Sequence, residues 1–342
     1  FDDYHVKYTS AGVWEETTAP AQQTTINSTT MPHTLVRNAN GTFTFAKQTW
    51  SSRLVGSALS NQDPSFIGGT INGIFFHRNR LGLYSGESLV MSRAGLYFNF
   101  FSKTMTAVLD DDPIDVSVSH TKVSVLKNVI PFNKTLLMFS DQTQFQVTST
   151  DSLTPKTITT EVVTEFESTP KCSPVSLGNS VYFASDKGTS SSVREYFVDV
   201  NTVTNDASEV TAHVPAYVPA NLFVLAASTT EDLVVALSTD ERNAIYVYKV
   251  YWNGDEKAQS AWGKFLLDAA DVILHIGFIN SVMYAVIQRA DGIYLESMNL
   301  QEGYTSTGFD YQILLDRQTS LTGAYNSVTN VTTWTLPYAD AG

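Results

Sequence analysis

Pairs of short apolar segments recur along this chain at intervals that a repeated unit of β-sheet would produce. The pairs lie near Ile74, Leu136, Val181, Leu233 and Val282, so the intervals are 62, 45, 52 and 49 residues. Each copy has the same order: a polar turn, an apolar strand, a second turn and a second strand. Periods near 40 to 50 residues with several strands each are typical of propeller blades. The repeat therefore predicts an all-β fold, a β-propeller of five or six small antiparallel blades, with the N-terminal hairpin supplying or completing a sixth.

The stretch from 74 to 115 shows the unit most clearly. Ile74–Phe76 and Leu81–Tyr84 are short apolar runs around a polar turn at 77–80, which is typical of a β-hairpin. A third run, Ser88–Ser92, and an aromatic fourth run, Tyr97–Phe101, follow after glycines. We expect these four runs to form one four-stranded antiparallel meander, which is one plausible blade.

Other strands carry apolar residues at successive positions, and not only at alternate ones. Leu233–Leu237 and Ala244–Trp252 are notable examples. Strands that are apolar on both faces are expected where sheets stack face to face. The stretch 263–272 fits either one helical turn or a strand, and we expect a strand because Leu266 and Leu267 lie beside Phe265.

The remaining parts of the chain flank this repeat. Residues 1–64 have fewer strand signals but include a hairpin in which Leu35–Arg37 and Thr42–Phe45 flank an Asn-Ala-Asn-Gly turn. We predict a small additional β region at 1–64, a β-propeller at 65–300, and a C-terminal β segment at 301–342. The last segment is expected to return to the N-terminal region or to the last blade.

Charge and cysteine content exclude several classes of protein. The chain has 34 acidic and 21 basic residues, for a net charge of -13, which disfavours wrapping around nucleic acid because such binding neutralises phosphates. Cys172 is the only cysteine, so no intrachain disulfide or thiolate zinc site can form. No run approaches 18 apolar residues, so we predict no membrane-spanning helix. Nucleotide-binding fingerprints, hydrolase nucleophile motifs and metalloprotease motifs are missing from the sequence, so we predict no cofactor and no catalytic residue.

Several contiguous segments resemble the tail tubular protein B, or tail nozzle, family of short-tailed bacteriophages. The resemblance begins with FFHRNRLGLYSGESLVMSRAG, YFNFF and LDDDPIDVSVSHTKVS, and continues through VREYFVD and ERNAIYVYKVYWNGDEKAQSAW in the family's order. It covers about Val6 to Glu296. Leu96 stands where the family's pattern leads us to expect an acidic residue. The family's N-terminal platform and distal tip are expected to be incomplete in this sequence.

The resemblance implies a structural virion protein of a phage tail. Six copies would form a tapered tube that conducts DNA outward on infection, with genomic DNA passing through the lumen without sequence-specific binding. The tail adaptor (tail tubular protein A) and the tail fibres would be its partners, and contact with the host envelope is a further expectation. The protein would be made in the bacterial cytoplasm and would end in the virion. An acidic lumen that repels DNA would fit the net charge.

One cluster of carboxylates stands out as a candidate site. Oxygen ligands suit calcium or magnesium, but the run at 110–115 lacks the spacing of a calcium loop, so a solvated turn and pairing with arginines of a neighbouring subunit are the alternatives. The weak metal candidates are Asp110, Asp111, Asp112 and Asp115. The candidates for assembly or inter-subunit contact are Arg78, Arg80, Arg93, Asp110, Asp112 and Asp115.

The sequence is also compatible with a different class of function. Propellers host many functions, so a propeller that binds or hydrolyses glycans at the host cell surface is the alternative to a tail conduit. Adhesion to a protein receptor through loops is a weaker one.

Overall fold

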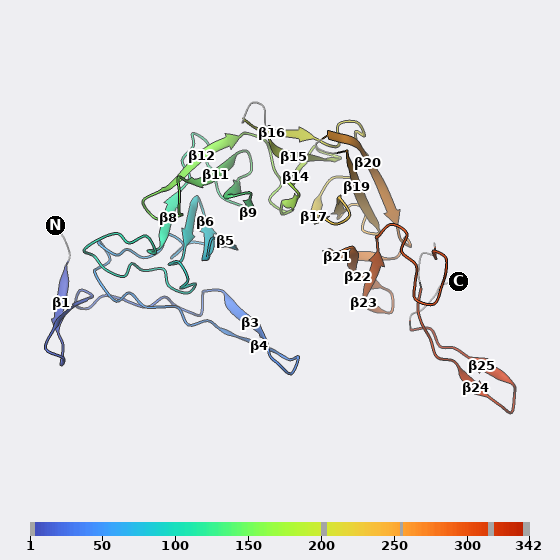
Figure 1. The fold of residues 1–342 in the computed structure, drawn as a ribbon, viewed down its shortest axis with the longest axis horizontal. Helices are drawn as coiled ribbons and strands as arrows, with labels where there is room; N and C mark the ends of the chain where they lie inside the picture. The colour runs from blue at the N-terminus through green and yellow to red at the C-terminus, as the bar shows by residue number, and fades with distance from the viewer. Residues whose placement is uncertain (1–3, 200–203, 254–255, 314–317, 338–342) are drawn as a thin grey trace. The chain divides into compact units, whose positions relative to one another are not determined.

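The computed structural model describes residues 4–199, 204–253, 256–313 and 318–337 (Figure 1). Over these ranges the fold is all-β, with several four-stranded antiparallel sheets and no helix. The chain divides into two compact units, which do not follow a single cut in the sequence. Unit 1 comprises 1–170, 179–185 and 194–209, and unit 2 comprises 171–178, 186–193 and 210–342.

Five antiparallel sheets follow one another along the chain, and each is made of consecutive strands. The first sheet contains β5 (Ile71–His77), β6 (Arg80–Ser85), β7 (Ser88–Met91) and β8 (Ile114–Ser117). The second contains β9 (Asn128–Phe132), β10 (Thr135–Phe139), β11 (Gln144–Ser149) and β12 (Ile158–Thr164). The third contains β13 (Val175–Leu177), β14 (Ser180–Asp186), β15 (Ser191–Asp199) and β16 (Thr204–Glu209). The fourth contains β17 (Leu222–Ser228), β18 (Leu233–Ser238), β19 (Ala244–Asn253) and β20 (Glu256–Leu266). The fifth contains β21 (Val272–Ile279), β22 (Val282–Arg289) and β23 (Gly292–Asn299).

Three two-stranded hairpins lie outside these sheets. They pair β1 (His5–Tyr8) with β2 (Trp14–Thr17), β3 (His33–Arg37) with β4 (Phe43–Lys47), and β24 (Ala324–Asn326) with β25 (Val331–Thr333). The hairpin expected near Leu35 is therefore confirmed. Two strands alone bury little surface, so such hairpins are at best marginally stable unless something packs against them.

The sequence repeat is confirmed at the level of whole sheets, because each of its five centres lies in a different sheet. Leu136, Val181, Leu233 and Val282 lie in the second strand of their sheets, β10, β14, β18 and β22. Ile74 lies in β5, the first strand of its sheet, which is why the first interval is the longest.

Short turns set the register of the first sheet. Arg78 and Asn79 both have positive φ, at 43° and 60°, so the loop from β5 to β6 is a two-residue turn with the twist that antiparallel strands require. Across these strands Gly73 is opposite Tyr84 and Gly82 is opposite Phe75. In each pair the aromatic ring covers the backbone of the glycine, since a Cβ on Gly82 would lie 1.9 Å from the Phe75 ring.

Within unit 1, the second sheet is buried on both faces. Leu136 and Met138 of β10 join a core with Leu89 and Met91 of the first sheet. The alternate residues of β10, Leu137 and Phe139, join a different core with Val181 and Phe183 of β14. The continuous apolar run in β10 is explained by this packing, as expected for a strand with a sheet on each side.

Within unit 2, the fourth and fifth sheets share one core. Val235, Leu237 and Ile245 pack with Ile273 and Met283. Stacking of sheets face to face, which the apolar β18 and β19 predicted, is confirmed for this pair. The predicted strand at 263–272 is correct at its two ends, but β20 stops at Leu266 and β21 starts at Val272.

The prediction that Tyr97–Phe101 forms the fourth strand of the first sheet is wrong. Tyr97–Phe101 is a loop, and β8 occupies the edge beside β7 instead. Phe100 and Phe101 are buried in a core with Trp50 and Phe66. Aromatic residues favour strands, but Phe100 and Phe101 anchor a loop that runs from β7 to β8.

Candidate functional site

The first residue of β6, Arg80, is fully buried and binds the loop that precedes β8. Its side chain is 1% exposed. The guanidinium donates to the main-chain carbonyls of Ser92 at 2.8 Å, Asp112 at 2.6 Å and Asp110 at 2.8 Å, and to that of Leu153 at 3.4 Å. Burial lowers the pKa of Arg80, while the nearby carboxylates of Asp111 and Asp112 oppose that shift. Arg80 therefore organises the acidic loop through its backbone.

Arg93 binds the same loop through the carboxylates of Asp111 and Asp112. It forms an ion pair with Asp111, and its Nε lies 3.9 Å from Oδ1 of Asp112. Asp112 is almost fully buried and accepts from the amides of Lys103 at 3.1 Å and Leu109 at 2.8 Å. Both Arg93 and Asp112 thus have partners within their own chain.

The other candidate residues point to separate partners. Asp115 accepts from the amide of Ser65 at 2.8 Å. Asp110 is exposed, 4.0 Å from Nζ of Lys156. Arg78 is exposed and donates to the carbonyl of Lys134 at 2.7 Å. The structure brings Arg80 to the backbone of the loop, while the carboxylates of Asp110 and Asp115 lie near separate partners.

The arrangement shows no ligand set for a cation. Among the described residues, no group of three or more His, Cys, Asp or Glu side chains could hold a metal ion. Asp112 and Asp115 already accept from backbone amides, and Asp111 faces an arginine. Chemically, the cluster fixes the conformation of a loop.

Sequence reasoning missed two arginines outside this cluster, Arg53, which is buried, and Arg289, which is partly buried. Arg53, buried, pairs with Asp63 at 2.6 Å and lies over the Phe101 ring. Arg289, in β22, pairs with Asp271 at 3.2 Å and with Glu296 at 2.6 Å, and the Glu296 hydrogen bond raises its pKa. No motif in the sequence singles them out, because isolated arginines and carboxylates seven to eighteen residues apart recur along the chain.

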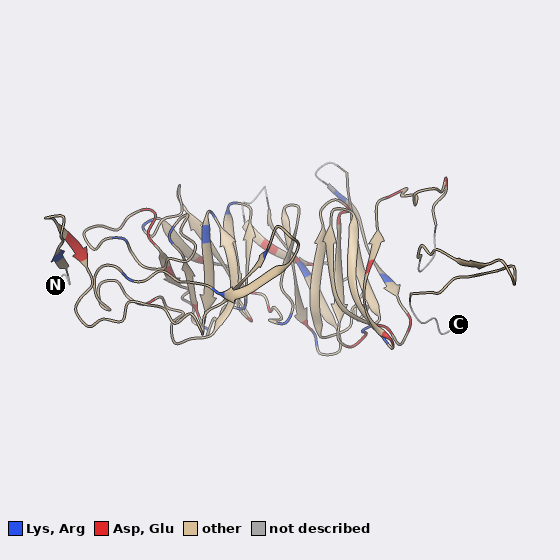
Figure 2. Ribbon diagram, turned by 90° about the horizontal axis from the view of Figure 1, so that it is seen from below, with Lys and Arg blue, Asp and Glu red and all other residues tan. Residues whose placement is uncertain are grey.

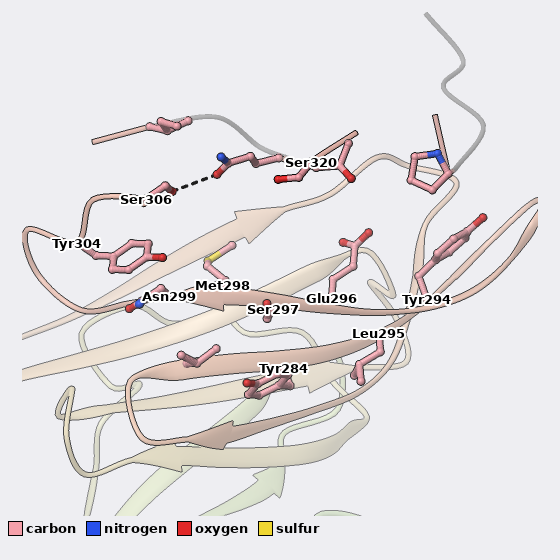
Figure 3. A pocket seen from close by; sticks show the side chains of 15 residues that line it. Tyr284, Tyr294, Leu295, Glu296, Ser297, Met298, Asn299, Tyr304, Ser306 and Ser320 are labelled. Atoms are coloured by element: carbon pink, nitrogen blue, oxygen red, sulfur yellow. Dashed lines mark hydrogen bonds between the residues drawn. The ribbon is translucent and has the colours of Figure 1, made fainter. Parts of the chain in front are cut away.

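A groove runs beside β23, at the edge of the fifth sheet (Figure 3). Its volume is about 810 Å³. One wall is β23 from Tyr294 to Asn299, and the other is the segment that follows, with Tyr304 and Ser306. Ser306 donates to Gln318 at 3.2 Å across that second wall. Figure 3 shows both walls: Met298 belongs to β23, and Tyr304 belongs to the segment that follows it.

The hairpin of β3 and β4 exposes large apolar side chains. On one face Leu35 lies opposite Phe45 and Arg37 lies opposite Phe43. Leu35 is 64% exposed and Phe45 is 71% exposed. All five residues of β4 are exposed. Contiguous exposed apolar surface of this kind marks sites of interaction with another molecule.

No described helix is long and apolar enough to cross a membrane. This finding comes from the part of the chain that the structure describes.

Comparison with known proteins gives consistent matches along the whole chain. The tail tubular protein gp12 of Escherichia phage T7 is 35% identical over 343 residues, which covers 98% of this chain and 43% of that protein. This chain therefore spans less than half of the length of that relative.

Solved structures give more distant similarities. Hsv2 of Kluyveromyces lactis has a TM-score of 0.45 at 10% identity, covering 86% of this chain and 91% of that chain. The Nup170 N-terminal domain in complex with Nup53 from Chaetomium thermophilum has a TM-score of 0.41 at 12% identity, covering 63% of this chain and 34% of that chain. The model of the family described as "Bacteriophage nozzle protein" matches residues 1–342. The chain belongs to the bacteriophage nozzle protein family.

Proposed function

We propose that this chain is a structural, non-enzymatic part of a phage tail, a subunit of a hexameric nozzle through which DNA leaves the virion. The observation that carries the proposal is the family match over residues 1–342, with 35% identity to the T7 tail tubular protein as its support. The adaptor ring and the tail fibres are the proposed protein partners, and contact with the host envelope belongs to the same proposal.

The architecture fits a rigid conduit wall. We propose that the five consecutive sheets are blades of a β-propeller, with 1–64 as a flanking β region and 301–342 as a C-terminal segment. Sheets stacked through dry cores, such as the one around Leu136 and Met138, form a body that resists deformation. Stiffness is the property that a fixed bore requires.

Charge favours passage of DNA without retention. The net charge of -13 disfavours retention of DNA, because non-specific binding requires phosphates to be neutralised. In the ribbon of Figure 2, Lys and Arg are short blue segments spaced along the described strands. The residues that face the lumen would then be mainly acidic or neutral.

The assembly itself gives the test. Electron microscopy of purified virions, with a tag on this protein, is expected to place six copies around the axis at the end of the tail. The purified protein is expected to release no sugar from capsule or peptidoglycan fragments. A location in the capsid shell, a different copy number, or steady hydrolysis of those glycans would contradict the proposal.

A further inference from the structure

We propose that the hairpin of β3 and β4 docks in the groove beside β23 of a second copy of this chain, where β4 adds a fourth strand to the fifth sheet. The inference rests on the proposed assembly and names one contact between its subunits. Four observations carry it: an exposed apolar hairpin, a three-stranded sheet with an open edge, a groove along that edge, and opposite charges on the two surfaces.

The hairpin needs a partner. One face carries Leu35, Phe43 and Phe45, all more than 60% exposed. The Phe45 ring stacks on His33 at 5.3 Å between centroids, so the face is formed before any partner arrives. Two strands that bury so little gain stability mainly from what covers them. Each of these side chains would contribute to affinity, because a partner would remove its apolar area from water.

The fifth sheet has room for one more strand. The first four sheets have four strands each, whereas the fifth has β21, β22 and β23. In the described chain no strand pairs with the outer edge of β23. Ile293 and Leu295 on β23 are 66% and 71% exposed. Open edges of this kind pair with strands of other chains.

The groove fits an extended strand in length and in chemistry. It follows β23 from Tyr294 to Asn299, and the β4 strand from Phe43 to Lys47 has five residues, or about 17 Å at the usual rise. Its apolar lining includes Leu295 and Met298, which would meet apolar side chains of the hairpin. Main-chain hydrogen bonds would add affinity, and the side chains would set register.

Charge selects this pairing over contact between like surfaces. Residues 33–47 contain Arg37 and Lys47 and no acidic residue, in a chain of net charge -13. Residues 290–313 contain no Lys, Arg or His and four acidic residues, of which Glu296 is paired with Arg289 next to this stretch and the other three are Asp291, Glu302 and Asp310. Opposite potentials steer two copies toward this contact and disfavour hairpin against hairpin.

The two surfaces differ, so the contact is head to tail. A heterologous contact generates a closed ring when its rotation closes, and a filament when it does not. A ring of copies is what the proposed nozzle requires, and this contact would supply one link between each neighbouring pair.

Two variants, each with one added cysteine, test the contact between chains. Thr44→Cys lies on β4 and Ser297→Cys lies on β23, both at exposed positions that leave the apolar face intact. A thiol crosslinker with a flexible spacer is expected to join one chain of each kind when the full-length variants are mixed, and to join neither variant to itself efficiently. Cys172 is buried and its pKa is raised by burial to about 12, so it does not compete.

Matched controls separate docking from collision. Val123→Cys, at a position 86% exposed, replaces Ser297→Cys in the control mixture and is expected to give no product. Phe45→Asp in the Thr44→Cys chain is expected to lower the yield by about tenfold or more, because the docked carboxylate would lose its water. The thermal unfolding midpoint of the Phe45→Asp variant should stay unchanged, since the Phe45 side chain is exposed.

Each other result has a defined meaning. Oligomers that form without the mixed product overturn this contact and leave the proposed assembly standing. A mixed product in assemblies that are not six-membered supports the contact and contradicts the proposed hexamer. If crosslinking succeeds only when Thr44→Cys and Ser297→Cys share one chain, the hairpin closes on its own molecule and the inference is wrong.

Discussion

At the scale of single residues, one buried arginine holds the loop that the sequence singled out for its carboxylates. Arg80 uses its donors on main-chain carbonyls, so the cluster is built around backbone groups and not around charge pairs alone. A buried polar group that loses its hydrogen-bond partner destabilises the fold by more than the hydrogen bond itself contributes to stability.

Replacement of Arg80 is the first prediction. Arg80→Met should lower the free energy of unfolding by about 3 to 5 kcal/mol, because it leaves buried carbonyls of the loop without a donor. Urea denaturation followed by tryptophan fluorescence measures the loss. Lys156→Met, at an exposed ion pair, should change stability by less than about 1 kcal/mol. Equal effects of the two variants would contradict the role assigned to Arg80.

His77 gives a prediction about pH. Burial, aided by Arg78, lowers the pKa of His77 from 6.5 to about 4 in the folded chain. The unfolded chain therefore binds more protons between these values, and stability should fall as pH drops from about 6.5 to about 4. His77→Gln should flatten that part of the profile in urea denaturation at several pH values. His213→Gln, at an exposed position, should leave the slope as it is.

At the scale of elements, two pairs of a glycine and an aromatic residue connect β5 and β6. The apolar pattern of each strand alone does not predict these pairs. Gly82 and Gly73 weaken a strand on their own, but Phe75 and Tyr84 cover them from the opposite strand. The glycines leave the space that the rings fill, and the pairs fix the register.

The third prediction concerns Gly82. Gly82→Ala should destabilise the protein by about 1 to 3 kcal/mol, because its Cβ would overlap the Phe75 ring and force repacking. Gly277→Ala in β21 is the matched control, since a Cβ there meets no atom within 4 Å. Thermal denaturation compares them. Phe75→Leu should relieve part of the Gly82→Ala effect, and a purely additive loss would argue against a steric cause.

At the scale of the whole molecule, net charge and exposed apolar surface have different roles. The charge of -13 repels DNA over distance, whereas the apolar hairpin and the edge of β23 that is open in the described chain act only at contact. An acidic protein can therefore assemble through local patches and still repel a passing duplex.

The fourth prediction addresses DNA. Fluorescence anisotropy with a labelled duplex should show no saturable binding up to about 100 μM protein at physiological salt, because few phosphates would be neutralised. A basic phage or bacterial DNA-binding protein serves as positive control in the same buffer. Micromolar binding that weakens steeply as salt rises would contradict the acidic conduit.

The sequence by itself determined where most strands lie, since hydrophobic alternation and turn residues act over a few neighbouring positions. It placed a polar turn at 77–80, where the structure has a two-residue turn, and one centre in each of the five sheets. The tertiary structure decided that Tyr97–Phe101 is a loop, that Asp112 is buried while Asp110 is exposed, and that β23 keeps an open edge. These outcomes depend on which distant segments meet, and no local pattern along the chain encodes that.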